Sequence, residues 1–343
     1  MSVSTASVPS ETPGARGQGL WLALSVLGVC VLSVAALRLG LRPTSWEQVW
    51  AALTAFQPDS ADQIVIREIR LPRLLGSILA GASLGVAGAL MQGMTRNPLA
   101  DPGLLGVNAG ASLAVVLCIL LLGITDPAAF VWLALAGSFA AALLVFLLGG
   151  GNQANPARLI LAGAAVSALF LAFSRSLLLV SQQTLEVYRF WILGGFDGIS
   201  FGTLQALIPF FAVGFVLALS ASFVLNALML GEDTARGLGV RVGLAQLLIG
   251  LAIVILCGTT VSMAGPIAFV GLIVPHLARW ITGPHMHWAI ALSSTIGAGL
   301  MICADMLGRM ALFGGNMQAG VIAALIGGPV LVWLVRRNGV TKL

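Results

Sequence analysis

Side chains that could carry out covalent or nucleotide chemistry are scarce in this chain of 343 residues. Its single lysine, Lys342, is the next-to-last residue, so the sequence holds no phosphate-binding loop of the form G-x-x-x-x-G-K-[ST]. The three histidines, His276, His285 and His287, and the four cysteines show no spacing typical of metal ligands. We therefore expect no catalytic residue, no bound metal and no cofactor in this chain, and no hydrolysis of ATP by it.

A short charged segment interrupts the apolar sequence between residues 227 and 242. Its centre, Leu230 to Val240, reads LGEDTARGLGV. Glu232 and Asp233 favour the start of a helix, where carboxylates interact well with free backbone N–H groups. The segment is either a solvated loop or two short helices lying across the membrane face, which would give a soluble partner a rigid element to move.

Arginines mark another candidate site. Arg70-Leu71-Pro72-Arg73 opens a predicted helix, and its two arginines, three residues apart, lie near one another on the helix surface. Arg309 ends a later helix on the same predicted side. Arginine pairs bidentately with carboxylates, so these residues could dock an acidic partner, although surface arginines often have no specific role.

The elements that position these residues are predicted to be membrane spans. Hydrophobic residues make up 59% of the chain and charged residues 8%, with a mean hydropathy of +1.03. Apolar runs long enough to cross a bilayer recur almost end to end. We expect one all-α transmembrane bundle of about ten helices, near residues 19–40, 72–94, 103–123, 127–149, 156–180, 203–226, 243–263, 266–282, 288–305 and 318–335.

That bundle would occupy residues 19–338, between tails at 1–18 and 339–343. The first tail is rich in Ser, Pro and Gly and is predicted to be disordered. The net charge of +5 comes from residues scattered at helix ends, which does not favour nucleic-acid binding. With ten spans both termini share a side, and Arg336, Arg337 and Lys342 suggest the cytoplasm, although arginines are almost equally distributed between the two ends.

Several dipeptides and small-residue rows predict local structure. Asp101-Pro102, Asp126-Pro127 and Asn155-Pro156 each place a capping side chain before a proline at a helix start. Small residues at helical spacing allow another helix to approach closely, either within the chain or in a second subunit. Three such rows occur: Ser77, Gly81, Gly85 and Ala89; Ala164, Ala168 and Ala172; Ala319, Ala323 and Gly327.

These stretches together resemble the iron-siderophore, haem and cobalamin permeases of ABC importers, the FecCD family. The resemblance runs from about Arg67 to Arg337. Besides the arginine and charged motifs, it rests on GALMQGMTRNPLADPGLLGVNAGAS at Gly88 to Ser112 and on AGPIAFVGLIVPHLAR at Ala264 to Arg279. The first of these stretches is most similar to permeases of the ferric-enterobactin type.

The resemblance implies a type II importer permease in a bacterial inner membrane. Its partners would be a second permease subunit, identical or paralogous, two ATP-binding subunits that hold ATP and magnesium, a periplasmic or lipid-anchored binding protein, and membrane lipid. It implies binding-protein docking by Arg70, Arg73 and Arg309. It also implies ATPase coupling through Gly231, Glu232, Asp233, Thr234, Ala235, Arg236, Gly237, Leu238, Gly239 and Val240, and a cytoplasmic gate formed by Asn97, Leu99, Asn155, Pro156 and Ala157.

Haem and cobalamin remain alternative cargoes, since a permeation path contacts its cargo loosely. An ion-coupled secondary transporter is a different class of alternative, and it would have to use Arg175 and Asp305 as its intramembrane charges. The sequence departs from many relatives before the last helix, where Asn316 and Gln318 replace an acidic residue and a proline. The alternative to a gate role for Asn97 and for Asn155 to Ala157 is that these residues are only helix caps.

Overall fold

The computed structural model describes residues 15–40, 44–151, 156–283, 285–310 and 317–338, and within these ranges its regular elements are all helical. The ten long helices each overlap a predicted span, which confirms the fold class. They are α1 (Ala15–Arg38), α4 (Leu71–Thr95), α5 (Val107–Leu122), α6 (Pro127–Leu148), α7 (Pro156–Leu178), α9 (Phe201–Met229), α11 (Val242–Ala264), α12 (Val270–Thr282), α13 (Met286–Gly308) and α14 (Ala319–Asn338).

Seven helical stretches of the described chain are long and apolar enough to cross a membrane. Helix α5 is apolar but has only 16 residues, and the 13 residues of α12 extend over only about 20 Å at 1.5 Å per residue. The predicted helix at 266–282 therefore starts too early. Pro266 stands in a non-helical stretch and Phe269 has a φ of 68°, so a regular helix begins only at Val270.

The helix predicted at 103–123 also begins later than expected. Asp101 caps a short 3₁₀ turn, η2 (Pro102–Leu105), by accepting a hydrogen bond from the Gly103 N–H at 2.7 Å. Gly106 then adopts a φ of 77°, which breaks the turn from α5. The capping dipeptide thus marks a real start, but of a different element. At the first span the difference is opposite, because α1 already begins at Ala15.

The sequence reading missed five short elements. They are α2 (Trp46–Thr54), α3 (Ala61–Ile64), the π-helical turn η1 (Val65–Arg70) that continues into α4, η2, and α8 (Gln182–Trp191). Helix α2 could have been found, because Ser45 and Gln48 form a capping box in which each side chain accepts a hydrogen bond from the other residue's N–H.

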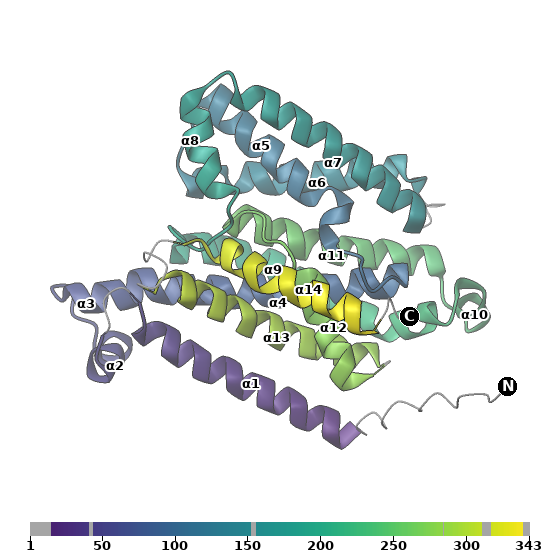
Figure 1. Ribbon diagram of the computed structural model, residues 1–343, viewed down its shortest axis with the longest axis horizontal. Coiled ribbons are helices and arrows are strands. Elements are labelled where there is room, and N and C mark those ends of the chain that lie inside the picture. Colours follow the sequence, from purple (N-terminus) through teal and green to yellow (C-terminus); the bar gives the residue numbers. More distant parts are fainter. Residues whose placement is uncertain (1–14, 41–43, 152–155, 284, 311–316, 339–343) are drawn as a thin grey trace.

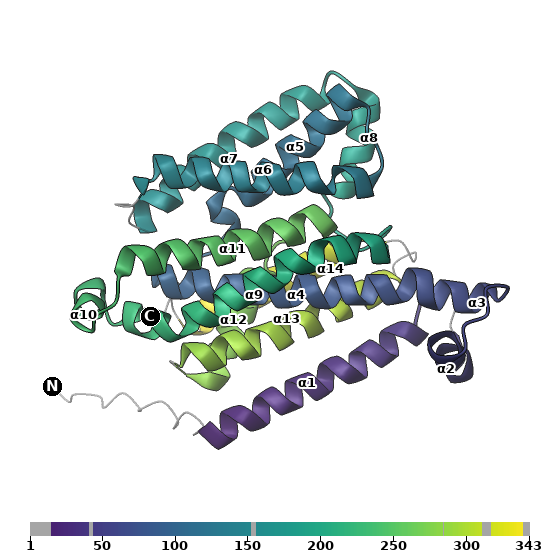
Figure 2. The same ribbon diagram turned by 180° about the vertical axis from the view of Figure 1, so that it is seen from behind.

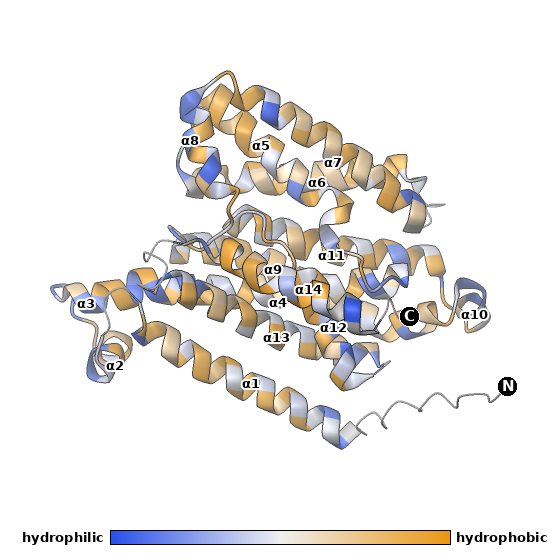
Figure 3. Ribbon diagram, viewed as in Figure 1, coloured by the Kyte–Doolittle hydropathy of each residue, from blue (hydrophilic) through white to orange (hydrophobic). Residues whose placement is uncertain are grey.

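Figures 1 and 2 show the helices in layers. Helices α5, α6 and α7 form one layer, and α4 lies inside the other, among α9, α11, α12 and α13. Helix α1 packs along α13 at the edge. The start of α1 and the end of α14 lie at the same end of the bundle as α10 (Glu232–Gly237), and α2 and α3 lie at the opposite end. Hydrophobic residues cover most of the helix lengths (Figure 3).

Close backbone contact explains the small residues of α4. A Cβ atom added to Gly81 would lie 2.1 Å from the Gly297 carbonyl oxygen, and one added to Gly85 would lie 2.3 Å from that of Ser293. This row therefore packs against α13 inside the chain. The row on α14 is also buried, with Gly327 against Phe269. The row on α7 differs, since Ala164, Ala168 and Ala172 are all exposed.

Candidate functional site

The charged segment between α9 and α11 folds as one short helix with a glycine on each side. Gly231 has a φ of 110° and precedes α10, and Gly239 has a φ of 83° and follows it, both in a region that favours glycine. Glu232 and Asp233 occupy the first turn of α10, as predicted. The expectation of two short helices is wrong, because the chain after Gly237 turns directly into α11.

This segment is fixed to the bundle at two points. Ala235 is fully buried, and its carbonyl accepts a hydrogen bond from the Val240 N–H at 3.0 Å. Glu232 Oε1 accepts a hydrogen bond from Gln246 Nε2 of α11 at 3.1 Å. The outer side of the segment is open, with Leu230 and Leu238 more than 60% exposed. Two apolar side chains are thus exposed on an otherwise charged, anchored element.

The remaining charges of α10 are paired with one another. Arg236 Nη1 donates to Asp233 Oδ1 at 2.9 Å and Arg236 Nη2 to Glu232 Oε2 at 3.0 Å. Thr234, Gly237 and Leu238 are exposed beside them. Exposed ion pairs of this kind contribute little stability. The segment therefore owes its position to Ala235 and to the Gln246 contact.

The turn after α4 lies beside this segment. Arg96 ends α4 with a φ of 50°, and its Nη1 is 4.0 Å from the position that a Cβ atom on Gly231 would take. The Asn97 side chain accepts a hydrogen bond from the Leu99 N–H at 3.0 Å, while Leu99 itself is 39% exposed. Asn97 thus stabilises the turn between α4 and η2 and is not a helix cap, because Arg96 and Asp101 occupy the cap positions there. Leu99 is free to contact other groups.

A buried contact that the sequence reading missed supports the same turn. Gln92, one helical turn before it, is fully buried, donates to the Leu272 carbonyl oxygen at 3.0 Å and accepts a hydrogen bond from Arg279 Nη2. A lone glutamine in an apolar helix has to find such partners, because an unsatisfied amide in this setting is costly. That requirement could have singled out Gln92 from the sequence.

The start of α7 is the other part of the predicted gate. Asn155 lies outside the described residues, Pro156 is the first residue of α7, and Ala157 is exposed. Further along α7, a Cβ atom on Gly163 would lie 1.7 Å from the Leu104 carbonyl oxygen of η2. Since η2 follows the Asn97 turn in the chain, the structure brings the two predicted gate segments to the same end of the bundle.

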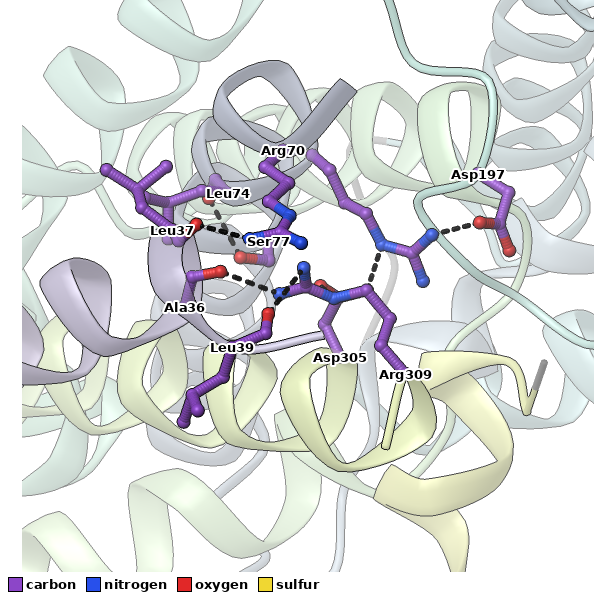
Figure 4. A network of polar contacts seen from close by, with 10 residues as sticks. Ala36, Leu37, Leu39, Arg70, Leu74, Ser77, Asp197, Asp305 and Arg309 are labelled. Atoms are coloured by element: carbon purple, nitrogen blue, oxygen red, sulfur yellow. Dashed lines mark hydrogen bonds and ion pairs between the residues drawn. The ribbon is translucent and has the colours of Figure 1, made fainter. Parts of the chain in front are cut away.

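At the opposite end, the three predicted docking arginines gather in one polar cluster, in which Figure 4 labels Arg70 and Arg309. Arg73 Nε donates to Asp305 Oδ1 at 2.6 Å, and Arg73 Nη1 donates to Asp197. Arg309 Nε lies 3.0 Å from Asp305 Oδ2 as an ion pair without hydrogen-bond alignment. Asp305 is only 2% exposed, whereas the Asp197 side chain is 56% exposed. Acidic and basic side chains therefore lie together where α4 begins and α13 ends.

Two of these arginines also cap α1. Arg70 Nη1 donates to the Leu37 and Arg38 carbonyl oxygens at 2.7 and 2.9 Å. Arg309 donates to the Leu39 and Ala36 carbonyl oxygens, each at 3.3 Å. The last carbonyls of a helix have no partner within the helix and carry partial negative charge, so a guanidinium group is a favourable cap.

Burial distinguishes these arginines from surface residues. Arg70 and Arg73 are 5% and 8% exposed, and burial lowers the pKa of Arg309 while the neighbouring Asp305 carboxylate opposes this shift. Docking by these residues stays a prediction, and the group of the cluster most open to a partner is Asp197. Sequence reasoning missed Asp197 as a member because the loop after α8 that carries it gives no local signal.

A cavity of about 960 Å³ opens beside this cluster. Arg73 and Asp197 line it together with Phe190 and Trp191 of α8 and with Gln318. A Cβ atom on Gly195 would lie 1.8 Å from Gln318 Oε1, so the loop after α8 closely contacts the start of α14. The lining combines aromatic faces with charged and amide groups.

Comparison with known proteins shows which family has this sequence and architecture. The model of the FecCD transport family matches residues 27–337. The chain is 38% identical over 327 residues to a siderophore transport system permease protein of Bacillus subtilis, covering 94% of this chain and 98% of that protein. It is 43% identical over 282 residues to the ferric enterobactin transport system permease protein of Escherichia coli, covering 81% of this chain and 84% of that protein.

A solved structure agrees with the sequence relatives. It is described as an inward-facing conformation of a metal-chelate type ABC transporter, and it superposes with a TM-score of 0.82 at 30% identity, covering 93% of this chain and 99% of that one. The family match, the relatives and the fold extend over nearly the whole chain. The chain belongs to the FecCD transport family.

Proposed function

We propose that this chain is the membrane-spanning permease subunit of an ABC importer that carries a ferric siderophore across a bacterial inner membrane. Membership of the FecCD family over residues 27–337 carries the proposal. Relatives named as siderophore and ferric enterobactin permeases make a ferric siderophore the favoured cargo. A cavity at one end of the bundle and an anchored, partly exposed helix at the other support a path that is driven from one side.

The energy would come from a separate subunit. Two ATP-binding subunits, with ATP and magnesium, would contact Gly231 to Val240, and the exposed Leu230 and Leu238 provide apolar contacts for them. This assignment puts the α10 end, and with it both termini, in the cytoplasm. Because Glu232 is tied to α11 and Gly231 lies beside Arg96, a push on α10 reaches the ends of both α11 and α4.

That push would act on the cytoplasmic gate. Leu99 is exposed next to the turn that Asn97 shapes, and Ala157 is exposed at the start of α7. The gate assignment for these residues, and for Asn155 and Pro156, follows from the family resemblance. Small and apolar groups suit a gate that closes without binding its polar cargo tightly.

A second permease subunit would complete the path. The exposed row Ala164, Ala168 and Ala172 on α7 is the one small-residue row of the three that does not pack inside the chain. In a membrane such a row favours close approach of another helix. We infer that α7 faces the second subunit, whether an identical copy or a paralogue.

A periplasmic or lipid-anchored binding protein would dock over the arginine cluster. Arg70, Arg73 and Arg309 are largely occupied by internal partners, so an acidic group of the binding protein would have to compete with Asp197 for Arg73. Docking would then exchange one ion pair for another and loosen the loop that lines the outer cavity. Exchange of partners at a half-exposed carboxylate such as Asp197 mainly affects orientation and encounter rate.

An ion-coupled carrier is less consistent with the structure. Such a carrier needs an intramembrane carboxylate available to a proton or cation. Asp305, which it would have to use, is buried against Arg73 and Arg309. Haem or cobalamin import would use the same architecture and differs only in cargo.

Uptake by cells that lack this chain tests the proposal. Deletion should abolish uptake of a ferric siderophore labelled with radioactive iron, and the chain expressed from a plasmid should restore it. Separate arms would supply ferric catecholate, ferric hydroxamate, haem and cobalamin. Loss of haem or cobalamin uptake alone would overturn the cargo, and unchanged uptake in every arm would overturn the proposed function.

A further inference from the structure

A second cavity, of about 430 Å³, lies between α6 and α11 in the part of the bundle nearer α10. Its lining is almost wholly apolar, with Phe139, Leu143 and Phe146 from α6 and Leu247 and Leu251 from α11. Leu143 and Leu251 are also 58% and 40% exposed, so the cavity reaches the surface of the bundle. Both helices meet the length and hydropathy of membrane spans, so in a bilayer this surface would face hydrocarbon wherever no second subunit covers it.

The part of α11 that lines the cavity is about as long as one leaflet is thick. On α11 its lining runs from Gly243 to Val254. Eleven residue steps at 1.5 Å give about 16 Å. Half the thickness of a hydrocarbon core of about 30 Å is almost the same. A polar side chain, Gln246, stands near the α10 end of this lining, where a lipid would change from acyl chain to head group.

We propose that this cavity binds one acyl chain of a membrane phospholipid, taken from the leaflet on the α10 side. An apolar cavity that opens sideways into a bilayer is filled by the surrounding hydrocarbon, since water finds too few hydrogen-bond partners there. The inference requires only that the bundle spans a bilayer, and it holds whatever the cargo of the chain is.

An acyl chain in this position would touch the part of α11 that holds α10. Gln246 lines the cavity and also donates the hydrogen bond to Glu232. The bound lipid would therefore fill the space into which α11 could otherwise bend when α10 moves. Lipid occupancy and the position of α10 are linked through this one side chain.

Gly250 offers a way to fill the cavity without disturbing its walls. A Cβ atom added there would meet no neighbouring group within 4 Å, and the same is true of Gly28 in the membrane-spanning α1. Gly250→Trp is the test variant, and Gly28→Trp is the matched control for an added indole on an apolar helix. Gly250→Leu is a milder variant in case the tryptophan prevents folding.

The full complex would be reconstituted in phosphatidylglycerol and phosphatidylethanolamine vesicles with a trace of phosphatidylglycerol carrying a diazirine midway along one acyl chain. After illumination, mass spectrometry would locate the labelled peptides. We expect labelling concentrated on residues 139–146 and 243–254, reduced at least fivefold by Gly250→Trp, reduced less by Gly250→Leu and unchanged by Gly28→Trp.

Labelling spread evenly over the exposed leucines of the bundle, or unchanged by both Gly250 variants, would overturn the proposal. Disulfide cross-linking between two copies of the chain that carry Leu143→Cys and Leu251→Cys would also overturn the proposal, because a second subunit would then cover the cavity. A failure of siderophore uptake in cells would not affect this result, so the two proposals fail independently.

Discussion

Asp305 provides the sharpest test of the polar cluster. Its carboxylate is 2% exposed and contacts Arg73 at 2.6 Å and Arg309 at 3.0 Å. The substitution Asp305→Asn keeps the shape of the side chain and removes its charge. Of the acidic partners in the described cluster, only the half-exposed Asp197 would then remain to face the guanidinium groups.

The expected loss of stability follows from burial. Removing one partner of a buried ion pair costs about 3–5 kcal/mol, because the other charge stays buried without compensation. Replacing both partners by apolar side chains of similar size is often close to neutral. Here Arg309 remains after the double substitution Asp305→Leu and Arg73→Met, so we expect partial recovery, with a coupling energy of about 1–3 kcal/mol between the two positions.

Equilibrium unfolding in mixed detergent micelles, followed by circular dichroism, would measure Asp305→Asn together with the four proteins of the cycle, which are the unchanged chain, Asp305→Leu, Arg73→Met and the double variant. Asp126→Asn is the matched control, since Asp126 is exposed and caps α6 through a hydrogen bond from the Ala128 N–H at 3.1 Å. Asparagine caps helices about as well as aspartate, so its cost should be under about 0.5 kcal/mol. A similarly small cost for Asp305→Asn, or strict additivity in the cycle, would refute the buried network.

Other predictions concern packing, coupling and docking. Gly81→Val should destabilise the bundle by at least about 1–3 kcal/mol in the same assay, because the new Cβ would lie 2.1 Å from the Gly297 carbonyl oxygen. Gly231→Val, at a φ of 110°, should strain the coupling segment by about 1–3 kcal/mol and lower transport relative to ATP hydrolysis in reconstituted complex, and an unchanged ratio would remove this glycine from the coupling path. Asp197→Asn should strengthen binding-protein docking roughly 1.4-fold to fivefold in a surface binding measurement, the range expected for a competing ion pair of about 0.2–1 kcal/mol, while weaker docking would indicate that Asp197 itself is a contact. Ala168→Trp should reduce association of two permease subunits on native gels, and normal association would exclude this face of α7 as the interface.

Local patterns in the sequence were sufficient to predict the long helices and the charged segment. Apolar runs and capping dipeptides are short-range features, so the ten spans and the start of α10 at Glu232 follow from them. Their errors arise where backbone geometry overrides hydropathy, as at Gly106 and Phe269, whose left-handed conformations delay α5 and α12. The family resemblance added what these patterns lacked, namely the transport class, the partners and their orientation.

The arrangement of the arginines could not be predicted in the same way. Arg73 finds Asp197 at a separation of 124 residues and Asp305 at 232, and no local pattern encodes such a pairing. The sequence suggested exposed docking residues, whereas the structure shows caps for α1 and a buried ion-pair cluster. Gln246 was missed for the same reason, since its importance comes from Glu232 on another element.

Reconstitution measures the central claim most directly. Vesicles containing this chain with its second permease subunit, ATP-binding subunits and binding protein should accumulate ferric siderophore only when ATP is supplied on the α10 side, and an uncoupler that collapses the proton gradient should leave uptake unchanged. Vesicles containing this chain alone should accumulate none. Accumulation by this chain alone, driven by a proton or sodium gradient, would contradict the account.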